Sequence, residues 1–351
     1  MKKLTILLCL LSLFGVSACT KQRTVSLKVL QLNLWYQGGI VLGGVDGIVD
    51  IINQTDPDII FLCEIRKIEN NPFIDELKEV LKQRNKEYDG RYIGQTMGVL
   101  SKYNLKNVVS PFALEDGSQP VCKATLEIGK RNLVVYSVHW DYTHYECYLP
   151  RGYSGTTWEK IDKAAGNADS VLIANRLSYR EEGVSALLED AGQEIEHGNI
   201  VLLGGDFNEP SHLDWQEDTK EMRNHNGLVI NWDCSLMLHK AGYRDAYREL
   251  YPDPVTHPGF SWPAGNRSAP LDKLLWVPDA DDRDRIDFIY YYPDKALTLT
   301  DVAIVGPVED LYMGRIVDCE TQDHFITPQG VWPSDHKGTL ATFILKSGPD
   351  K

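Results

Sequence analysis

Hydrophobic and polar residues alternate along much of the chain with the two-residue period of a half-buried strand. Residues 25–35 (VSLKVLQLNLW) show this period clearly, and residues 58–65 (DIIFLCEI) form the short apolar run typical of a central strand. Similar patterns predict further strands at 97–101, 121–128, 132–139, 199–204, 285–292, 299–305 and 338–345. Strands are therefore expected over the whole length of the chain.

Fewer segments have the spacing of a helix. Residues 45–53 have it, and Asp56 with Pro57 ends that helix. Further helices are predicted at 73–86, 169–191 and 234–249. Many strands, few helices and polar residues at the strand ends predict two packed sheets with helices on the outside.

Two stretches lack either periodicity. Residues 141–168 are rich in aromatic residues and glycine, and residues 252–284 contain proline, glycine and tryptophan before an acidic cluster. Loops longer than about 15 residues are uncommon and are usually functional or disordered. The aromatic content favours a function for the first stretch, with cover for a sheet edge as the competing interpretation.

Polar side chains recur where the predicted strands begin or end. Each one alone has an ordinary explanation as a turn, cap or solvated residue. Chance placement at six strands far apart in the sequence is much less plausible, so the set as a whole predicts a site. Its members are Asn33, Glu64, His139, Asp206 with Asn208, Asp287, and Asp335 with His336.

The segment LLGGDFNEPS, residues 202–211, shows how such a strand end is built. Gly204 and Gly205 allow the backbone to turn sharply. Asp206 and Asn208 are two residues apart on an extended chain and therefore point the same way. Both are expected to face the same reacting group.

The residue types define a chemistry. Carboxylate and amide oxygens suit Mg²⁺, with Mn²⁺ or Ca²⁺ as further choices, and Glu64 and Asn33 are the main candidates. Zinc is not expected, because no thiolate or histidine cluster accompanies these oxygens. A histidine paired with a carboxylate can accept a proton from water or stabilise a developing oxyanion. Together these groups fit metal-assisted attack of water on a phosphoryl group.

The segments LNLW, FLCEI, GVLSKYNL, VVYSVHW, LLGGDFNEP, AGYRDAY, RIDFIYY and PSDHKGTLATF extend from residue 27 to 345. In this order they resemble the endonuclease/exonuclease/phosphatase superfamily, which includes deoxyribonuclease I. The resemblance implies an α+β fold, a four-layer α/β/β/α sandwich of two mostly antiparallel sheets flanked by helices. It also implies a metal-dependent phosphoric ester hydrolase.

The resemblance further implies a role for each residue of the set. Glu64 is the principal metal ligand, supported by Asn33, and Asp335 lies close to the metal. His336 is the general acid or base, oriented by Asp287. Asp206 aligns or deprotonates the attacking water, and Asn208 and His139 hold the phosphoryl oxygens. The division of labour between Asp206 and His336 stays open.

The first residues have the pattern of an export signal. Lys2 and Lys3 precede a short apolar run, and the sequence VSAC then ends at Cys19, as in a bacterial lipoprotein lipobox. We expect a signal peptide at 1–18, a leader at 19–26 anchored by lipid on Cys19, and one catalytic domain at 27–347. The protein would then sit on the periplasmic or cell-surface face of a bacterial membrane. An ordinary signal peptide that contains a cysteine is the competing interpretation.

The charge of the chain bears on its partners. The formal net charge is −14, and removal of residues 1–18 with their two lysines makes it −16. This acidity disfavours tight binding of nucleic acid but does not exclude a nuclease. The five cysteines beyond the signal have no CxxC spacing, so a thiolate metal site is not expected, while one or two disulfides stay open.

Substrate recognition is expected in the aromatic stretch. Arg151 could bind a second phosphate, and the segment HPGFSW (257–262) could form the opposite rim of the site. The side chains that could stack on a sugar or base are Tyr142, His144, Tyr145, Tyr148 and Tyr153. The favoured function is hydrolysis of a phosphate mono- or diester on a small, glycan-linked or lipid-linked substrate. The alternatives are an extracellular nuclease and a non-catalytic surface binding protein. No protein partner is predicted.

Overall fold

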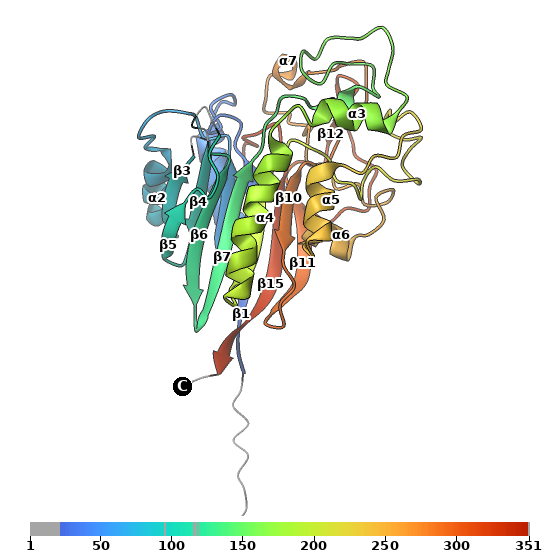
Figure 1. Cartoon of the computed structure of the whole chain (residues 1–351). Coiled ribbons are helices and arrows are strands. Elements are labelled where there is room, and N and C mark those ends of the chain that lie inside the picture. Colours follow the sequence, from blue (N-terminus) through green and yellow to red (C-terminus); the bar gives the residue numbers. More distant parts are fainter. Residues whose placement is uncertain (1–21, 95, 115–116, 118, 350–351) are drawn as a thin grey trace, which may run out of the picture.

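The computed structural model describes residues 22–94, 96–114, 117 and 119–349. Two large β-sheets pack face to face, and helices cover their outer faces (Figure 1). The expected α/β/β/α sandwich is confirmed.

The first sheet has seven strands. Its order is β14 (Phe325–Ile326), β11 (Leu297–Val305), β15 (Gly338–Pro349), β1 (Gln22–Asn33), β2 (Ile59–Cys63), β4 (Met97–Ser101) and β3 (Asp89–Ile93). Strands β1 and β2 are parallel, with Asn33 opposite Cys63. Asn33 and the residue after Cys63 therefore leave this sheet at the same edge.

The second sheet has six strands. Its order is β5 (Leu105–Val109), β6 (Val121–Ile128), β7 (Arg131–His139), β8 (Ile200–Asp206), β10 (Asp287–Tyr291) and β9 (Arg244–Asp245). His139 of β7 lies opposite Asp206 of the parallel strand β8, and Asp206 lies opposite Asp287 of the antiparallel strand β10. The register alone brings three predicted site residues to one edge.

Alternation of side chains gives the sandwich its layers. Leu27, Val29 and Phe61 of the first sheet meet Val135 and Leu202 of the second in one buried cluster. The opposite face of the first sheet packs on α1 (Gly44–Thr55) and α2 (Phe73–Gln83). The outer face of the second sheet packs on α4 (Arg180–Glu196) and α5 (Asp233–Lys240).

The prediction of a single helix at 169–191 is wrong, because the structure has two helices there. The chain forms α3 (Ala168–Asn175), capped by the Asn167 side chain, and then turns before α4 begins at Arg180. The buried guanidinium of Arg180 donates to the carbonyls of Asp141, Thr143 and His144. The break therefore lets the start of α4 hold the loop that follows β7.

The helix expected at 234–249 is also divided. Helix α5 ends at Lys240, Gly242 follows with a φ of 93°, and Arg244–Asp245 pairs with β10 as strand β9. Asp245 then caps α6 (Ala246–Leu250) through its carboxylate. The short elements outside the sheets are a 3₁₀ turn (Glu146–Tyr148), α7 (Leu271–Leu274) and the hairpin β12 (Asp310–Tyr312) with β13 (Arg315–Val317).

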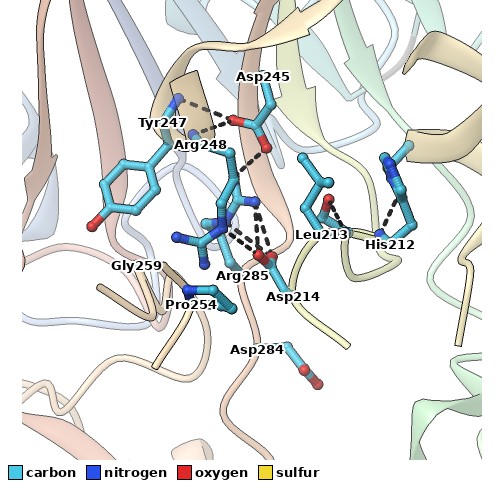
Figure 2. Close-up of polar contacts among 12 residues, drawn as sticks. His212, Leu213, Asp214, Asp245, Tyr247, Arg248, Pro254, Gly259, Asp284 and Arg285 are labelled. Atoms are coloured by element: carbon cyan, nitrogen blue, oxygen red, sulfur yellow. Dashed lines mark hydrogen bonds and ion pairs between the residues drawn. The ribbon is translucent and has the colours of Figure 1, made fainter. Parts of the chain in front are cut away.

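A buried cluster of charges fastens the loops beside the second sheet. Arg285 donates to both carboxylate oxygens of Asp214 at 3.0 Å and to Asp245 at 2.7 Å. Arg248 donates to Asp214 at 2.6 Å and, through its remaining nitrogens, to three loop carbonyls. Figure 2 shows dashed contacts from both guanidinium groups to Asp214 and a further contact from Arg285 to Asp245. We call these four residues the ion cluster.

The five cysteines at 63, 122, 147, 234 and 319 are free, so the disulfides left open by the sequence are not formed in this structure. In the part of the chain that the structure describes, no helix is both long enough and apolar enough to cross a bilayer. Residues 1–21, with the expected signal peptide and the lipidation site at Cys19, lie outside the described residues.

Candidate active site

The predicted residues meet at one edge of the sandwich. Strands β1, β7 and β8 each end there with one of the predicted side chains, β2 ends there one residue before Glu64, and β10 and β15 begin there. Asn33 and Glu64 come from the first sheet and His139, Asp206 and Asp287 from the second, while Asp335 and His336 lie in the loop just before β15. Both sheets therefore contribute to the site.

Asn33 connects the groups from the two sheets. Its Nδ2 donates to Glu64 Oε1 at 3.0 Å and to Asp206 Oδ2 at 2.9 Å. The same nitrogen lies 3.3 Å from Nε2 of His336, and the backbone N–H of Trp35 holds Oδ1 at 2.9 Å. The amide side chain is thus fixed and positions the acids around it.

His336 and Asp287 form a buried pair. Nδ1 of His336 lies 2.8 Å from Asp287 Oδ2, while Gln31 Nε2 donates to the other oxygen of Asp287 at 2.6 Å. This arrangement leaves Nε2 of His336 directed toward Asp206 Oδ2 at 3.9 Å and Asp335 Oδ1 at 4.0 Å. A carboxylate on one ring nitrogen, with the second nitrogen facing the acids and Asn33 Nδ2, is the geometry of an oriented general acid or base.

The end of β8 positions Asp206 and Asn208 together. The backbone N–H of Asn208 donates to Asp206 Oδ1 at 2.8 Å, and Asn208 has a φ of 45°, in the left-handed region. Its Nδ2 donates to the carbonyl of Trp140 at 3.0 Å. His139 Nδ1 lies 2.9 Å from the Thr96 hydroxyl, and its Nε2 lies 4.0 Å from Asp206 Oδ2.

The buried thiol of Cys63 bonds to the backbone of β7 and β8 close to two of these residues, His139 and Asp206. Sγ donates to the carbonyl of Val138 at 3.2 Å and accepts the backbone N–H of Asp206 at 3.4 Å. Cys63 itself precedes Glu64 in the sequence. One buried side chain of the first sheet therefore bonds to both central strands of the second.

The pKa values of Asp206, Asp335 and His336 are all raised, because the buried site contains more acids than bases. Burial and the neighbouring Asp287 raise the pKa of Asp206 to about 8, and burial raises the pKa of Asp335 to about 7. Burial alone would lower the pKa of His336, but Asp287, Asp206 and Asp335 together raise it well above its ordinary value. Burial lowers the pKa of His139.

The donor set fits a divalent cation. Glu64, His139 and Asp206 each place a ligand atom within 4.8 Å of the others, as do Asp206, Asp287 and His336. Oδ1 of Asp335 is buried and has no hydrogen-bond partner among the described residues. A buried carboxylate oxygen without a partner is costly unless a cation or water satisfies it. The oxygen-rich set matches a hard cation.

A cavity of about 390 Å³ opens directly onto these groups. Its catalytic lining consists of Glu64, His139, Asn208, Asp335 and His336, with Thr96 beside them. Most of the remaining wall is aromatic, and two cations also line it. These residues are Trp35, Tyr36, Tyr142, Tyr145, Tyr148, Trp158, Trp262 and Trp276, with Arg66 and Lys67.

Of the six residues predicted to bind the substrate, Tyr142, Tyr145 and Tyr148 line the cavity and the other three do not. Tyr142 is 59% exposed. Arg151 is wrongly predicted as a phosphate ligand, because its buried guanidinium pairs with Asp284 at 2.6 Å and stacks on Trp215. Tyr153 is buried outside the cavity lining, and His144 contacts Thr156 and Glu146 instead.

Several functional neighbours were missed by the sequence analysis. Gln31 lies two residues before Asn33 on the same face of β1, so the alternation of that strand was a usable signal. Trp262 lies in HPGFSW (257–262), which was expected to form a rim of the site, and only its indole bond to Asp335 Oδ2 at 3.3 Å was not anticipated. Thr96 and Arg66 lie in loops and carried no comparable signal.

With this geometry described, the class of protein is defined. Residues 30–336 match the endonuclease/exonuclease/phosphatase family, and the chain belongs to that family. This confirms the resemblance seen in the motifs and the expected enzyme class, a metal-dependent phosphoric ester hydrolase. The acidic cluster at the strand ends is a candidate site for its divalent cation.

Individual relatives are more distant. The chain is 26% identical over 325 residues to the uncharacterized protein F14F9.5 of Caenorhabditis elegans, with 91% of each chain covered. Truncated TDP2 of Caenorhabditis elegans has a similar structure at 17% identity, with 91% of this chain and 97% of that chain covered and a TM-score of 0.50. An AP endonuclease from Archaeoglobus fulgidus matches at 14% identity, 90% and 98% coverage and a TM-score of 0.50. These two structures support the fold.

Proposed function

We propose that this protein hydrolyses a small phosphate mono- or diester, free or linked to a glycan or lipid, with Mg²⁺ as its cofactor and Mn²⁺ or Ca²⁺ as substitutes. The observation that carries the proposal is the aromatic cavity of about 390 Å³ that opens onto the catalytic residues. Small-molecule sites are concave, mainly apolar and supplied with a few convergent polar groups. A duplex groove would instead need an extended basic surface.

The residues of the site divide the reaction between them. A divalent cation held by Glu64, with Asp335 and Asn33 close by, would supply a Lewis acid for the phosphoryl oxygens. Asp206 aligns the attacking water or takes its proton. His336, held by Asp287 at 2.8 Å, transfers a proton through Nε2. Asn208 and His139 stabilise the charge that develops on the phosphoryl oxygens.

A nuclease is the second candidate, and one observation favours it. Arg66 and Lys67 line the cavity and are exposed, which gives an otherwise acidic protein a local cationic strip. A short strip of this kind can hold a strand end without binding a duplex tightly. The non-catalytic alternative has less support, because all the motif residues are assembled in one site.

We also propose that the chain is exported and tethered to a bacterial membrane by lipid on Cys19. The support is the sequence pattern at residues 2–19. Metabolic labelling with a fatty acid tests this proposal: label should enter the full chain and should be lost on Cys19→Ala.

The function is tested with a soluble form starting at residue 20, in Mg²⁺, Mn²⁺, Ca²⁺ or EDTA. The substrates are p-nitrophenyl and bis-p-nitrophenyl phosphate, sugar and inositol phosphates, sphingomyelin, plasmid DNA and RNA. Metal-dependent hydrolysis of a small ester with intact plasmid supports the proposal. Rapid plasmid nicking that falls with added salt would instead establish the nuclease. Glu64→Gln should abolish either activity while the protein stays folded.

A further inference from the structure

We infer that one wall of the cavity is a stacking subsite, and that the substrate carries a ring with a flat apolar face next to its scissile phosphate. The inference rests on the proposed function and narrows its substrate class. Nucleoside bases, sugars and aryl groups share this chemistry, whereas acyclic esters such as glycerol phosphate lack it. We call Tyr142, Trp158, Trp276 and Trp262 the aromatic wall.

An unbroken series of ring contacts forms this wall. Tyr142 lies parallel to Trp158 at 6.4 Å between centroids, and Trp158 meets Trp276 edge-on at 5.0 Å. Trp276 contacts Trp262 at 6.4 Å, and Trp262 lies 6.2 Å from the ring of His336. Rings therefore follow one another from Tyr142 to the catalytic imidazole.

Exposure changes along the wall. Tyr142 is 59% exposed and Trp276 is 38% exposed, whereas Trp262 is only 8% exposed. The indole of Trp262 donates to Asp335 Oδ2, so the inner end of the wall touches the proposed metal site. Exposed aromatic faces that continue into a catalytic cavity are suited to bind a ligand rather than to close a core.

The inner end of the wall is held by packing. Tyr145 and Tyr148 contact Trp262 at 5.8 and 6.5 Å. Behind them the Arg151 guanidinium pairs with Asp284, whose second oxygen accepts the indole N–H of Trp215 at 3.1 Å. Because these rings are already fixed, the protein loses little conformational freedom when a ligand stacks there.

The charged part of the cavity complements an anionic ligand. Arg66 and Lys67 lie two and three residues after Glu64, the proposed metal ligand, and both are exposed. Neither side chain forms an ion pair with another described residue. The cavity therefore offers cations for phosphate oxygens and aromatic faces for a ring. A phosphate ester of a ring compound uses both features, while an acyclic ester uses only the first.

The first experiment measures binding, which does not depend on turnover. Adenosine monophosphate, glucose 6-phosphate and glycerol phosphate are titrated by calorimetry and by tryptophan fluorescence into the Mg²⁺-loaded Asp206→Asn protein, which is expected to hydrolyse them very slowly. A ring ligand should quench Trp158 or Trp276 and bind roughly tenfold more tightly than glycerol phosphate, as expected for one stacked ring. The nucleotide and sugar arms show which ring is preferred.

Variants of Tyr142 separate stacking from general apolar contact. Tyr142→Leu should lose roughly tenfold in affinity for the ring ligand and leave glycerol phosphate unchanged, while Tyr142→Phe should keep wild-type binding. Tyr312→Leu is the matched control, because Tyr312 is also exposed, at 38%, and lies outside the cavity lining. Trp276→Leu should repeat the effect of Tyr142→Leu.

Equal affinities for ring and acyclic ligands, or equal losses in Tyr142→Leu and Tyr142→Phe, would overturn the inference. Failure of the proposed function looks different: ring ligands would bind and quench fluorescence, yet no phosphate ester would be hydrolysed. Hydrolysis of glycerol phosphate at the same kcat/KM as ring esters would reject the stacking subsite and keep the phosphoesterase.

Discussion

The protein buries two groups of charged side chains that differ in how they are neutralised. The ion cluster contains Asp214, Asp245, Arg248 and Arg285, so two carboxylates meet two guanidinium groups (Figure 2). The active site contains Glu64, Asp206, Asp287 and Asp335 around two histidines, and no lysine or arginine of the described residues forms an ion pair with these acids.

The pKa values of the carboxyl groups shift in opposite directions in the two groups of charges. Burial alone would raise the pKa of Asp214, but Arg248 and Arg285 hold it below its ordinary value. Burial raises the pKa of Asp206 and Asp335, with no arginine to reverse the effect. The ion cluster is therefore complete in itself, whereas the active site has an excess of negative charge that a divalent cation would neutralise.

The largest expected effect is on catalysis. Asp206→Asn should lower kcat roughly 10²- to 10⁴-fold, because the group that aligns or deprotonates water is lost. The free energy of unfolding in EDTA should change by less than about 1 kcal/mol, since one lost hydrogen bond offsets the relief of acid repulsion. Steady-state kinetics and urea unfolding check both. A variant that kept full activity would show that Asp206 has no catalytic role.

The matched change in the ion cluster should have the opposite outcome. Asp214→Asn leaves Arg285 and Arg248 short of a buried partner and should cost roughly 3 to 5 kcal/mol in unfolding free energy. The folded fraction should keep a kcat close to that of the wild type. Urea unfolding monitored by circular dichroism measures the loss. A change below 1 kcal/mol would show that the cluster contributes little to stability.

The pH dependence of the metal-free protein sharpens the comparison. The pKa values of Asp206 and Asp335 are raised to about 8 and 7, and that of His336 is raised as well. Groups with raised pKa values stabilise the folded state at low pH. For Asp206 and Asp335 this contribution is complete below about pH 4 and is lost as the pH rises toward 8, whereas for His336 it is complete below about pH 6.5 and is lost at higher pH. Asp214, with a lowered pKa, instead loses its contribution as the pH falls below its usual value.

Thermal unfolding between pH 4.5 and 8.5 tests this sign. The decline of Tm with rising pH in EDTA should be weaker in Asp206→Asn than in the wild type.

Mg²⁺ at about 100 times its Kd should stabilise the wild type by roughly 2.7 kcal/mol at pH 8, and it should stabilise Glu64→Gln by less. Equal stabilisation of the two proteins would place the cation elsewhere.

The smallest expected effect concerns the thiol between the sheets. Cys63→Ala removes the bonds to the Val138 carbonyl and the Asp206 N–H and should cost roughly 1 to 2 kcal/mol, with a several-fold lower kcat. Cys63→Ser keeps a donor and an acceptor and should restore most of the kcat. Kinetics with KM and kcat determined separately check this prediction. An alanine variant as active as the serine variant would assign Cys63 to packing alone.

The fold and the catalytic residues could be predicted because their signals are local. Two-residue alternation identifies the central strands. The expected extended spacing of Asp206 and Asn208 is wrong, because β8 ends at Asp206 and Asn208 has a φ of 45°. The sequence motifs then supply an order that matches one family. The assigned roles of these residues stay predictions until the variants are measured.

The loop residues could not be predicted because their partners are distant. Arg151 resembles a free cation in an aromatic loop, yet it pairs with Asp284, 133 residues further along the chain. Asp214 and Arg285 are separated by 71 residues, and the sequence next to each of them does not predict that they pair. The break at Arg180 likewise depends on carbonyls of a preceding loop rather than on its own helix.

Strand β1 begins beside the end of β15, with Arg23 opposite Gly348, at the end of the sandwich away from α3 and α7 (Figure 1). The catalytic side chains lie at the other end, where β1, β7 and β8 finish. A surface, a resin or a fusion partner joined directly to the start of β1 or to the end of β15 would therefore leave the cavity facing bulk solvent. Immobilised enzyme is expected to keep its specific activity whichever terminus is used.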